Sequence, residues 1–347
     1  MLAQIQSQFT ITYGRYRFLQ KERGKTVFKY TIRKLLAMIP KFLAITVVLF
    51  VLLELSPGDP LTLRVTPEVY KSMTETMKQE YYIKFGLDKP AVVRYFQWLG
   101  DLLKGDLGYS TAYGLPISEL VSARLPSSME LQFGTLLFSG IIGVFLGFVC
   151  AVFQKTVVDY FFSGVSALGS SLPEYFFASA FMIIFAMKLG WFPTGGRIPT
   201  DILNPTFWDR IPYMTLPIAS MTFTMVCGLV RHTRTTMVDV MNMEYIKTAR
   251  SKGLSEFVVY FKHCLRNALP PVMTMLVMRL PMLVGGSVVI EQVFNYIGIG
   301  SLSMGASQNL DAPLCLFCIT VSATVTLIAS TLIDILTAAL DPRVRFE

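Results

Sequence analysis

The sequence predicts an all-α membrane protein with six transmembrane helices. Three observations lead to this fold class: few charged residues, six long apolar runs, and basic residues that gather on one side of the predicted membrane. Of the 347 residues, 53% are hydrophobic and 16% are charged, and the mean hydropathy is +0.52. Soluble domains carry about 25% charged residues. Much of the surface of this protein is therefore expected to face lipid.

The six apolar runs are each long enough to cross a membrane, since about 20 apolar residues span the hydrocarbon core. The first run, 35–55, follows a basic leader without a small-residue cleavage site, so it is expected to be an uncleaved anchor. The second run contains Gly143 and Gly147 in a G-x-x-x-G pattern, which predicts close helix packing within the chain. The other runs are 131–153, 160–187, 212–230, 270–290 and 314–336.

The orientation follows from the charges of two loops. Loop 231–269 carries seven basic residues, whereas loop 291–313 carries none. Because basic loops stay in the cytoplasm, the first loop is predicted to be cytoplasmic and the second external. Six spans then place both the N- and C-termini in the cytoplasm, with residues 1–30 as a cytoplasmic extension and 31–347 as the transmembrane domain.

The segment 56–130 is expected to lie on the external side. Its eight basic and nine acidic residues nearly balance, so it does not alter the predicted orientation. A Pro-Gly-Asp-Pro turn at 57–60 ends the first span. Amphipathic stretches such as 95–103 predict short surface helices and not a separately folded domain.

Several kinds of site are disfavoured. The Gly-Lys-Thr at 24–26 is similar to the end of a P-loop, but Leu19 stands where that loop needs its first glycine. His232 and His263 are the only histidines and no carboxylate cluster lies near them, so no catalytic or metal-binding residue is expected. The basic residues follow the topology, which argues against a nucleic-acid partner.

Loop 231–269 contains the most polar island between the apolar runs. A helix is predicted over 235–252, with Gly253 ending it in a left-handed conformation and Ser255 starting a second helix. Positions 257, 260, 261, 264, 265 and 268 would form one apolar stripe on that second helix. The pattern predicts a helix–Gly–helix elbow at the membrane surface.

Two short motifs stand in this loop. They are formed by Tyr245, Thr248, Ala249, Arg250, Lys252, Gly253, Leu254 and Ser255, followed by Arg266, Asn267, Ala268, Leu269 and Pro271. With these residues the loop resembles the EAA loop of ABC-importer permeases, specifically those of the dipeptide/oligopeptide/nickel permease family. The general EAA consensus begins with a glutamate where Lys247 stands here, which is similar to the peptide subfamily. Weaker similarities continue in order from about Arg33 to the end of the chain.

The resemblance implies a type I ABC importer permease fold for 31–347 and a coupling helix that docks on a separate ATPase. ATP and magnesium would bind to two P-loop ATPase partners, and this chain would bind no cofactor. It also implies a second, homologous permease subunit, membrane lipid around both, and an extracellular or periplasmic substrate-binding protein. The residues assigned to ATPase coupling are Glu244, Tyr245, Ile246, Lys247, Thr248, Ala249, Arg250, Lys252, Gly253 and Leu254.

Two charged residues lie near the middle of predicted spans. Glu174 follows Pro173 in the third run, and Arg279 precedes Pro281 in the fifth. A charge at the centre of a span costs about 2.5–3.5 kcal/mol on the insertion scale. We expect both side chains to face the bundle interior along the translocation path; a structural ion pair or a contact with the second permease is the alternative.

The sequence thus predicts a multi-pass permease subunit in a prokaryotic cell membrane, working in an ATP-driven importer of peptides. Nickel, glutathione or an oligosaccharide remains open as cargo. An ion-coupled secondary transporter is a distant alternative, because it would need midplane carboxylates and paired broken helices. A membrane-embedded enzyme is disfavoured by the lack of a His or Asp cluster.

Overall fold

The computed structural model of the chain describes residues 30–55, 58–199 and 205–340, and the regular structure of this part is helical. Four helices in it are long and apolar enough to cross a membrane. They are Tyr30–Leu55, α5 (Ile117–Val152), α8 (Phe207–Met241) and Ala312–Ile335, the last within α15 (Ala312–Leu340). The predicted extension 1–30 lies outside the described residues except for Tyr30.

The third predicted run forms a sharply bent pair of helices. α6 (Val157–Ser171) and α7 (Glu174–Phe181), which continues as the π-helix η2 (Met182–Lys188), meet at 104°. Pro173 cannot continue the hydrogen-bond ladder of α6, and its ring favours an extended residue before it. Leu172 is accordingly extended, with φ −98° and ψ 144°.

The fifth predicted run, 270–290, is not one continuous helix. It is divided among α11 (Arg266–Val277), α12 (Met282–Gly285) and α13 (Val288–Val293). Pro281 lacks a backbone N–H, and Gly286 takes a left-handed φ of +68° that other residues rarely adopt. The described residues therefore provide four uninterrupted candidate spans and one bent pair, and a sixth crossing remains a prediction.

Helices α5 and α8 pack closely along their length. A Cβ atom on Gly143 would come within 2.6 Å of the Leu229 Cβ, and one on Gly147 within 2.5 Å of the Thr233 Cβ. Only glycine permits this approach, so the predicted packing of the G-x-x-x-G pattern within the chain is confirmed.

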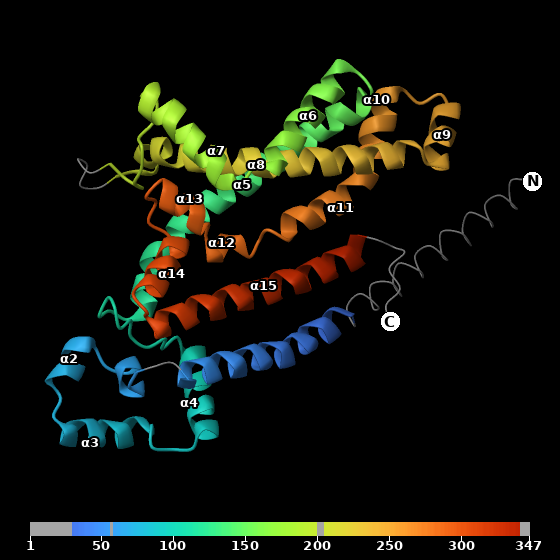
Figure 1. The fold of residues 1–347 in the computed structure, drawn as a ribbon. Helices are drawn as coiled ribbons and strands as arrows, with labels where there is room; N and C mark the ends of the chain where they lie inside the picture. The colour runs from blue at the N-terminus through green and yellow to red at the C-terminus, as the bar shows by residue number, and fades with distance from the viewer. Residues whose placement is uncertain (1–29, 56–57, 200–204, 341–347) are drawn as a thin grey trace, which may run out of the picture.

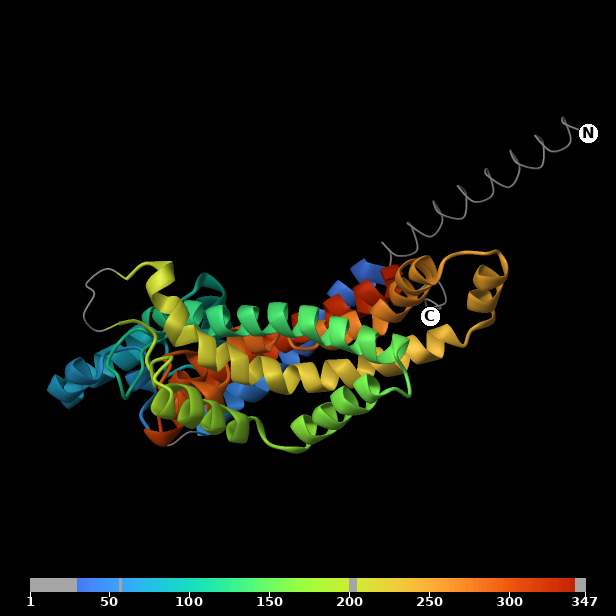
Figure 2. The ribbon, with the colours of Figure 1, turned by 90° about the horizontal axis from the view of Figure 1, so that it is seen from above.

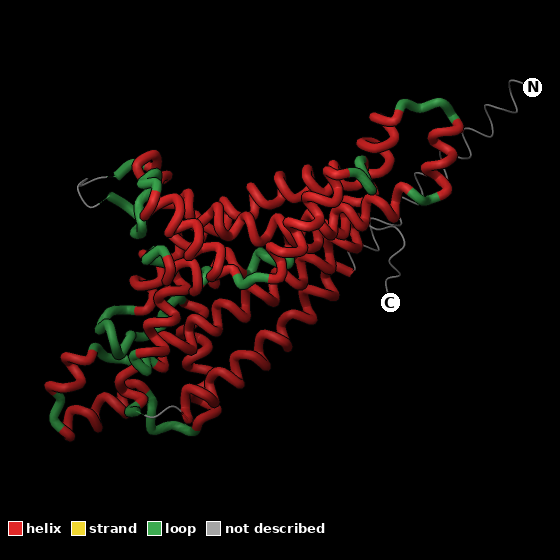
Figure 3. The backbone as a smooth tube through the Cα atoms, turned by 45° about the horizontal axis from the view of Figure 1, so that its top comes forward, coloured by secondary structure: helices red, strands yellow, loops and turns green. Residues whose placement is uncertain are grey.

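The molecule is elongated, and its two ends carry different kinds of structure (Figures 1 and 2). One end carries the short helices α2 (Pro67–Ser72), α3 (Glu75–Phe85) and α4 (Ala91–Lys104), and the other carries α9 (Glu244–Ser251) and α10 (Glu256–Val258). Figure 3 shows the same separation after rotation.

The first and last described helices run side by side in Figure 1 and are joined near the α9 end. The Lys34 Nζ donates to the Asp334 Oδ2 at 2.6 Å. The beginning of the first helix and the end of α15 thus lie next to each other at the same end of the bundle.

The short helices α2–α4 and the 3-10 helix η1 (Pro60–Leu63) confirm the predicted surface helices of 56–130. Asp59 organises them by accepting hydrogen bonds from the Leu61 backbone N–H, the Tyr70 hydroxyl and the Tyr82 hydroxyl. Burial acts to raise the pKa of Asp59, but these hydrogen bonds outweigh it and hold that pKa below its usual value. Burial and the bond to Asp59 raise the pKa of Tyr82 to about 12.

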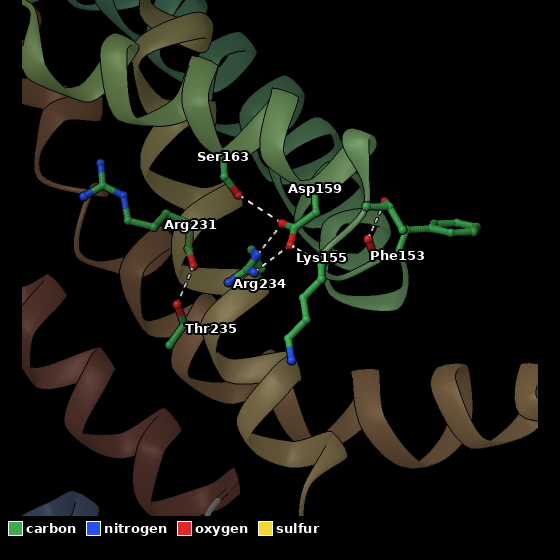
Figure 4. A network of polar contacts seen from close by, with 8 residues as sticks. Phe153, Lys155, Asp159, Ser163, Arg231, Arg234 and Thr235 are labelled. Atoms are coloured by element: carbon green, nitrogen blue, oxygen red, sulfur yellow. Dashed lines mark hydrogen bonds and ion pairs between the residues drawn. The ribbon is translucent and has the colours of Figure 1, made fainter.

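Two carboxylates, the buried Asp159 and the half-buried Glu130, join segments that are distant in sequence. Asp159 of α6 accepts two hydrogen bonds from Arg234 of α8, at 2.5 and 2.7 Å, and further bonds from the Lys155 N–H and the Ser163 hydroxyl (Figure 4). Near the opposite end of the bundle, Glu130 of α5 also has three partners, namely Arg197, Arg210 and Tyr296.

Candidate functional site

The segment 244–254 forms a separate short helix and a turn beyond the end of α8. The predicted single helix over 235–252 is wrong, because α8 ends at Met241 and α9 begins at Glu244. The Asn242 side-chain amide donates to the Val238 carbonyl at 2.9 Å and so satisfies the last turn of α8. Met243 is then extended, with φ −72° and ψ 146°, which redirects the chain.

Gly253 makes the turn between α9 and α10. Its φ of +77° is left-handed, and its N–H donates to the Arg250 carbonyl at 2.9 Å. The predicted cap is therefore confirmed. Ser255 precedes α10 with an extended backbone, so the predicted start of the second helix is confirmed as well.

A bidentate ion pair joins the two arms of this elbow. The Arg250 Nε and Nη2 donate to the two carboxylate oxygens of Glu256 at 3.0 and 3.1 Å. The Arg250 guanidinium also lies over the Tyr260 ring, 5.9 Å from its centroid. The hydrogen bond from Arg250 holds the pKa of Glu256 below its usual value. A second pair, Lys247 with Glu244 at 2.8 Å, lies within α9.

Two buried apolar side chains hold α9 against the bundle. Ile246 and Ala249 are buried in a cluster that includes Ala151 of α5, Met237 of α8 and Cys264 of the second arm. The remaining residues assigned to coupling are exposed: Glu244, Tyr245, Lys247, Thr248, Arg250, Lys252, Gly253 and Leu254. The elbow is thus a protruding polar surface on a fixed base, suited to hold another macromolecule rather than to enclose a small substrate.

The residues of the apolar stripe predicted for the second arm differ in burial. Cys264 and Ala268 are buried, and so is Val259, which was not part of the predicted stripe. Phe257 and Phe261 are exposed, and the Phe261 ring lies 4.7 Å from that of Phe148 of α5. Residues Val259–Leu265 form a π-helix (η3), which has more residues per turn than the α-helix assumed from the sequence. That change of period turns Val259 toward the bundle and leaves Phe257 and Phe261 exposed.

Glu174 and Arg279 both lie where a helix is interrupted. Glu174 is the first residue of α7, after the 104° bend, and Arg279 follows the end of α11. Each charge is on the favourable end of a helix dipole. Arg279 is exposed and its guanidinium contacts the Met282 sulfur at 3.8 Å, whereas Glu174 is half-buried. The described contacts do not include an ion pair between the two side chains.

Sequence reasoning missed two carboxylates that pair with distant arginines. Asp159 and Glu130 lie at the edges of predicted runs. The arginine partner of Asp159 is 75 residues away, and those of Glu130 are 67 and 80 residues away. A carboxylate at the end of an apolar run, with arginines elsewhere in the chain, is the only pattern that could have indicated them.

Among the described residues, no group of three or more His, Cys, Asp or Glu side chains could hold a metal ion. A groove of about 970 Å³ between α5, α6, α7 and α8 is lined mostly by apolar side chains, including Phe133, Phe138, Phe181 and Phe223. This lining offers no nucleophile–base arrangement.

Comparison with known proteins gives consistent matches. Residues 143–346 match the family model described as binding-protein-dependent transport system inner membrane component. The oligopeptide transport system permease protein AppB of Bacillus subtilis (strain 168) is 37% identical over 320 residues, covering 91% of this chain and 99% of that protein. The oligopeptide transport system permease protein OppB of Haemophilus influenzae is 33% identical over 325 residues, covering 92% and 100%.

A solved structure supports the same fold. A chain of the inward-facing MetNI methionine ABC transporter aligns with a TM-score of 0.50 at 16% identity, covering 64% of this chain and 96% of that chain. At this identity the likeness concerns the fold alone.

Proposed function

Because the chain belongs to the family of binding-protein-dependent transport system inner membrane components, we propose that it forms half of the translocation pathway of an ATP-driven peptide importer. The chain is a multi-pass membrane permease subunit and is not itself an enzyme. Peptide cargo is favoured by the names of its relatives AppB and OppB. Nickel, glutathione or an oligosaccharide is the alternative, to be decided by mass spectrometry of the ligand carried by the binding protein.

The observation that carries the proposal is the protruding elbow. A polar surface stands on a buried base at one end of the bundle, opposite the α2–α4 end (Figure 1). We assign 244–254 as the coupling segment, which contacts one of two ATPase subunits that bind ATP and magnesium. The opposite end would face the substrate-binding protein, and a second, homologous permease would complete the pathway, with six spans in each subunit and cytoplasmic termini.

Replacing Gly253 tests the coupling role. The space around a Cβ at this position is open, so Gly253→Val acts through backbone strain alone. A left-handed conformation costs a β-branched residue about 1–2 kcal/mol, which lowers the equilibrium constant for forming the native elbow roughly tenfold. We expect uptake by the assembled transporter to fall, by up to that factor, while ATP hydrolysis continues.

Gly253→Asn is the matched control, since asparagine tolerates the left-handed region and should retain most of the uptake. Membrane insertion of both variants is checked by their yield in the purified complex. Unchanged uptake by Gly253→Val would refute the assigned role.

We also propose that Glu174 and Arg279 face the translocation path. Their support is their shared position at helix interruptions and the lack of an ion pair between them. Glu174→Gln and Arg279→Gln should each reduce uptake without changing assembly. Lys188→Gln, an exposed charge at the end of η2, should leave uptake unchanged. Normal uptake by both variants would leave the two charges with a structural role only.

A further inference from the structure

Helix α4 presents an exposed apolar surface that nothing in the described chain covers. Val92, Phe96 and Leu103 are 68%, 63% and 72% exposed, and Val93 is exposed beside them. At about 100° per residue these four side chains fall within one sector of about 100°. We call this set of four residues the outer α4 face.

The neighbouring sector of α4 packs against the first helix. Tyr95 and Leu99 are buried there in one cluster with Phe50. The rings of Phe50 and Tyr95 lie 5.5 Å apart, and the Tyr95 hydroxyl shares a buried hydrogen bond of 2.9 Å with the Thr46 hydroxyl. The apolar arc of α4 is therefore wider than the part that the first helix covers.

These contacts place α4 beside the apolar part of the first helix. Thr46 and Phe50 precede its end at Leu55 by nine and five residues, which is about 14 and 8 Å at 1.5 Å per residue. Side chains of α4 thus contact a candidate membrane span inside its apolar part and not only at its end.

The polar sector of α4 is turned away from the outer face and its charges are paired. Arg94 contacts Glu54 at 2.6 Å, and Asp101 contacts Arg64 at 2.7 Å. Exposed lysines stand at the two ends of the helix, Lys89 just before it and Lys104 as its last residue.

The first helix also exposes apolar side chains, on the side turned away from its contact with α4. Val48, Val51, Leu52 and Leu55 of that helix are exposed, and only 17% of its most apolar window is buried. An exposed apolar surface of this kind on a membrane span faces acyl chains.

We propose that the outer α4 face lies in the acyl chains of the membrane leaflet opposite the coupling segment. Lys89 and Lys104 then lie at the level of the phosphate groups, as basic residues do on interfacial amphipathic helices. Through its ion pairs with Arg64 and Glu54, α4 fixes the α2–α4 end of the molecule at a set depth in the membrane. This inference depends on the membrane location of the chain and is independent of the proposed cargo and coupling.

Nitroxide accessibility in the assembled transporter tests the proposal. The complex is reconstituted in liposomes of phosphatidylethanolamine and phosphatidylglycerol, with the five native cysteines replaced and a spin label on Phe96→Cys or Val92→Cys. Lys104→Cys on the same helix is the control. We expect the ratio of oxygen to nickel-chelate accessibility to be several-fold higher at 96 and 92 than at 104.

Two results would overturn the proposal. A ratio at 96 and 92 equal to that at 104 would place the face in water. An immobilised label that neither reagent reaches would show that a protein partner covers it. A photoreactive benzophenone amino acid at position 96 in the chain with native cysteines gives an independent decision. A phospholipid adduct supports the proposal, whereas a cross-linked polypeptide, or the absence of any lipid adduct, contradicts it.

Discussion

At the scale of single residues, Arg250 connects the two arms of the elbow. Its guanidinium holds both oxygens of Glu256, and its stem leaves α9 in the last turn, where a positive charge suits the helix dipole. Both side chains are partly open to solvent, so the pair is expected to contribute only about 0.2–1 kcal/mol. A free energy of this size favours the observed position of α9 relative to α10 but does not hold α9 there rigidly.

Acidification should loosen the elbow. Because Arg250 lowers the pKa of Glu256 in the folded state, the stabilisation is fully present above the usual glutamate value of 4.5. It is lost as the pH falls through the lower folded value. At neutral pH, Glu256→Gln should remove it, so that the amides of α9 exchange with deuterium about two- to fivefold faster.

The control for this measurement is Glu244→Gln. Glu244 pairs with Lys247 inside α9 and makes no link to α10, so its loss should not free the elbow. Equal exchange in the two variants would show that the Arg250–Glu256 pair does not hold the arms together.

At the scale of elements, the packing of α5 against α8 decides where the elbow stands, because α9 extends from the end of α8 (Figure 1). Gly147 lies where the two helices are closest: a Cβ there would also come within 2.9 Å of the Val230 carbonyl oxygen. Backbone cannot move aside as a flexible side chain can, so this contact leaves no room for a larger residue.

Gly147→Ala is therefore expected to destabilise the subunit by about 1–3 kcal/mol through overpacking. The measurement is the thermal unfolding midpoint of the purified complex in detergent. Gly228→Ala on α8 is the control, since a Cβ there meets nothing within 4 Å and alanine favours a helix. If both variants melted alike, the close approach at Gly147 would not limit stability.

At the scale of the whole molecule, the separation of the two ends favours transport driven from outside this chain. The elbow and the α2–α4 helices lie at opposite ends of an elongated bundle (Figures 1 and 2). The described residues contain broken helices, with Glu174 at the start of α7 and the buried Glu291 in α13. Glu291 already accepts hydrogen bonds from the Ser128 hydroxyl and the Ser301 N–H. An ion-coupled carrier would be expected to gather more such groups.

Uptake in proteoliposomes should therefore require ATP, the ATPase subunits and the second permease, and a protonophore should not abolish it. The matched control is the complex with the P-loop lysine of the ATPase replaced, which should assemble and not transport. Uptake by this subunit alone, driven by an ion gradient, would instead support a secondary transporter.

The helical membrane class, the left-handed turn at Gly253 and the short helices of 56–130 could be predicted from the amino-acid sequence. These features depend on composition, on periodicity or on the backbone preference of one residue, all of which act locally. The partner of Asp159, the break of α8 at Asn242 and the π-helical shift that buries Val259 could be recognised only in the folded chain. All three depend on atoms that only folding brings together. A hydrogen bond to a distant side chain, or the close packing of a buried apolar side chain, then outweighs the preference of the local sequence for a regular α-helix.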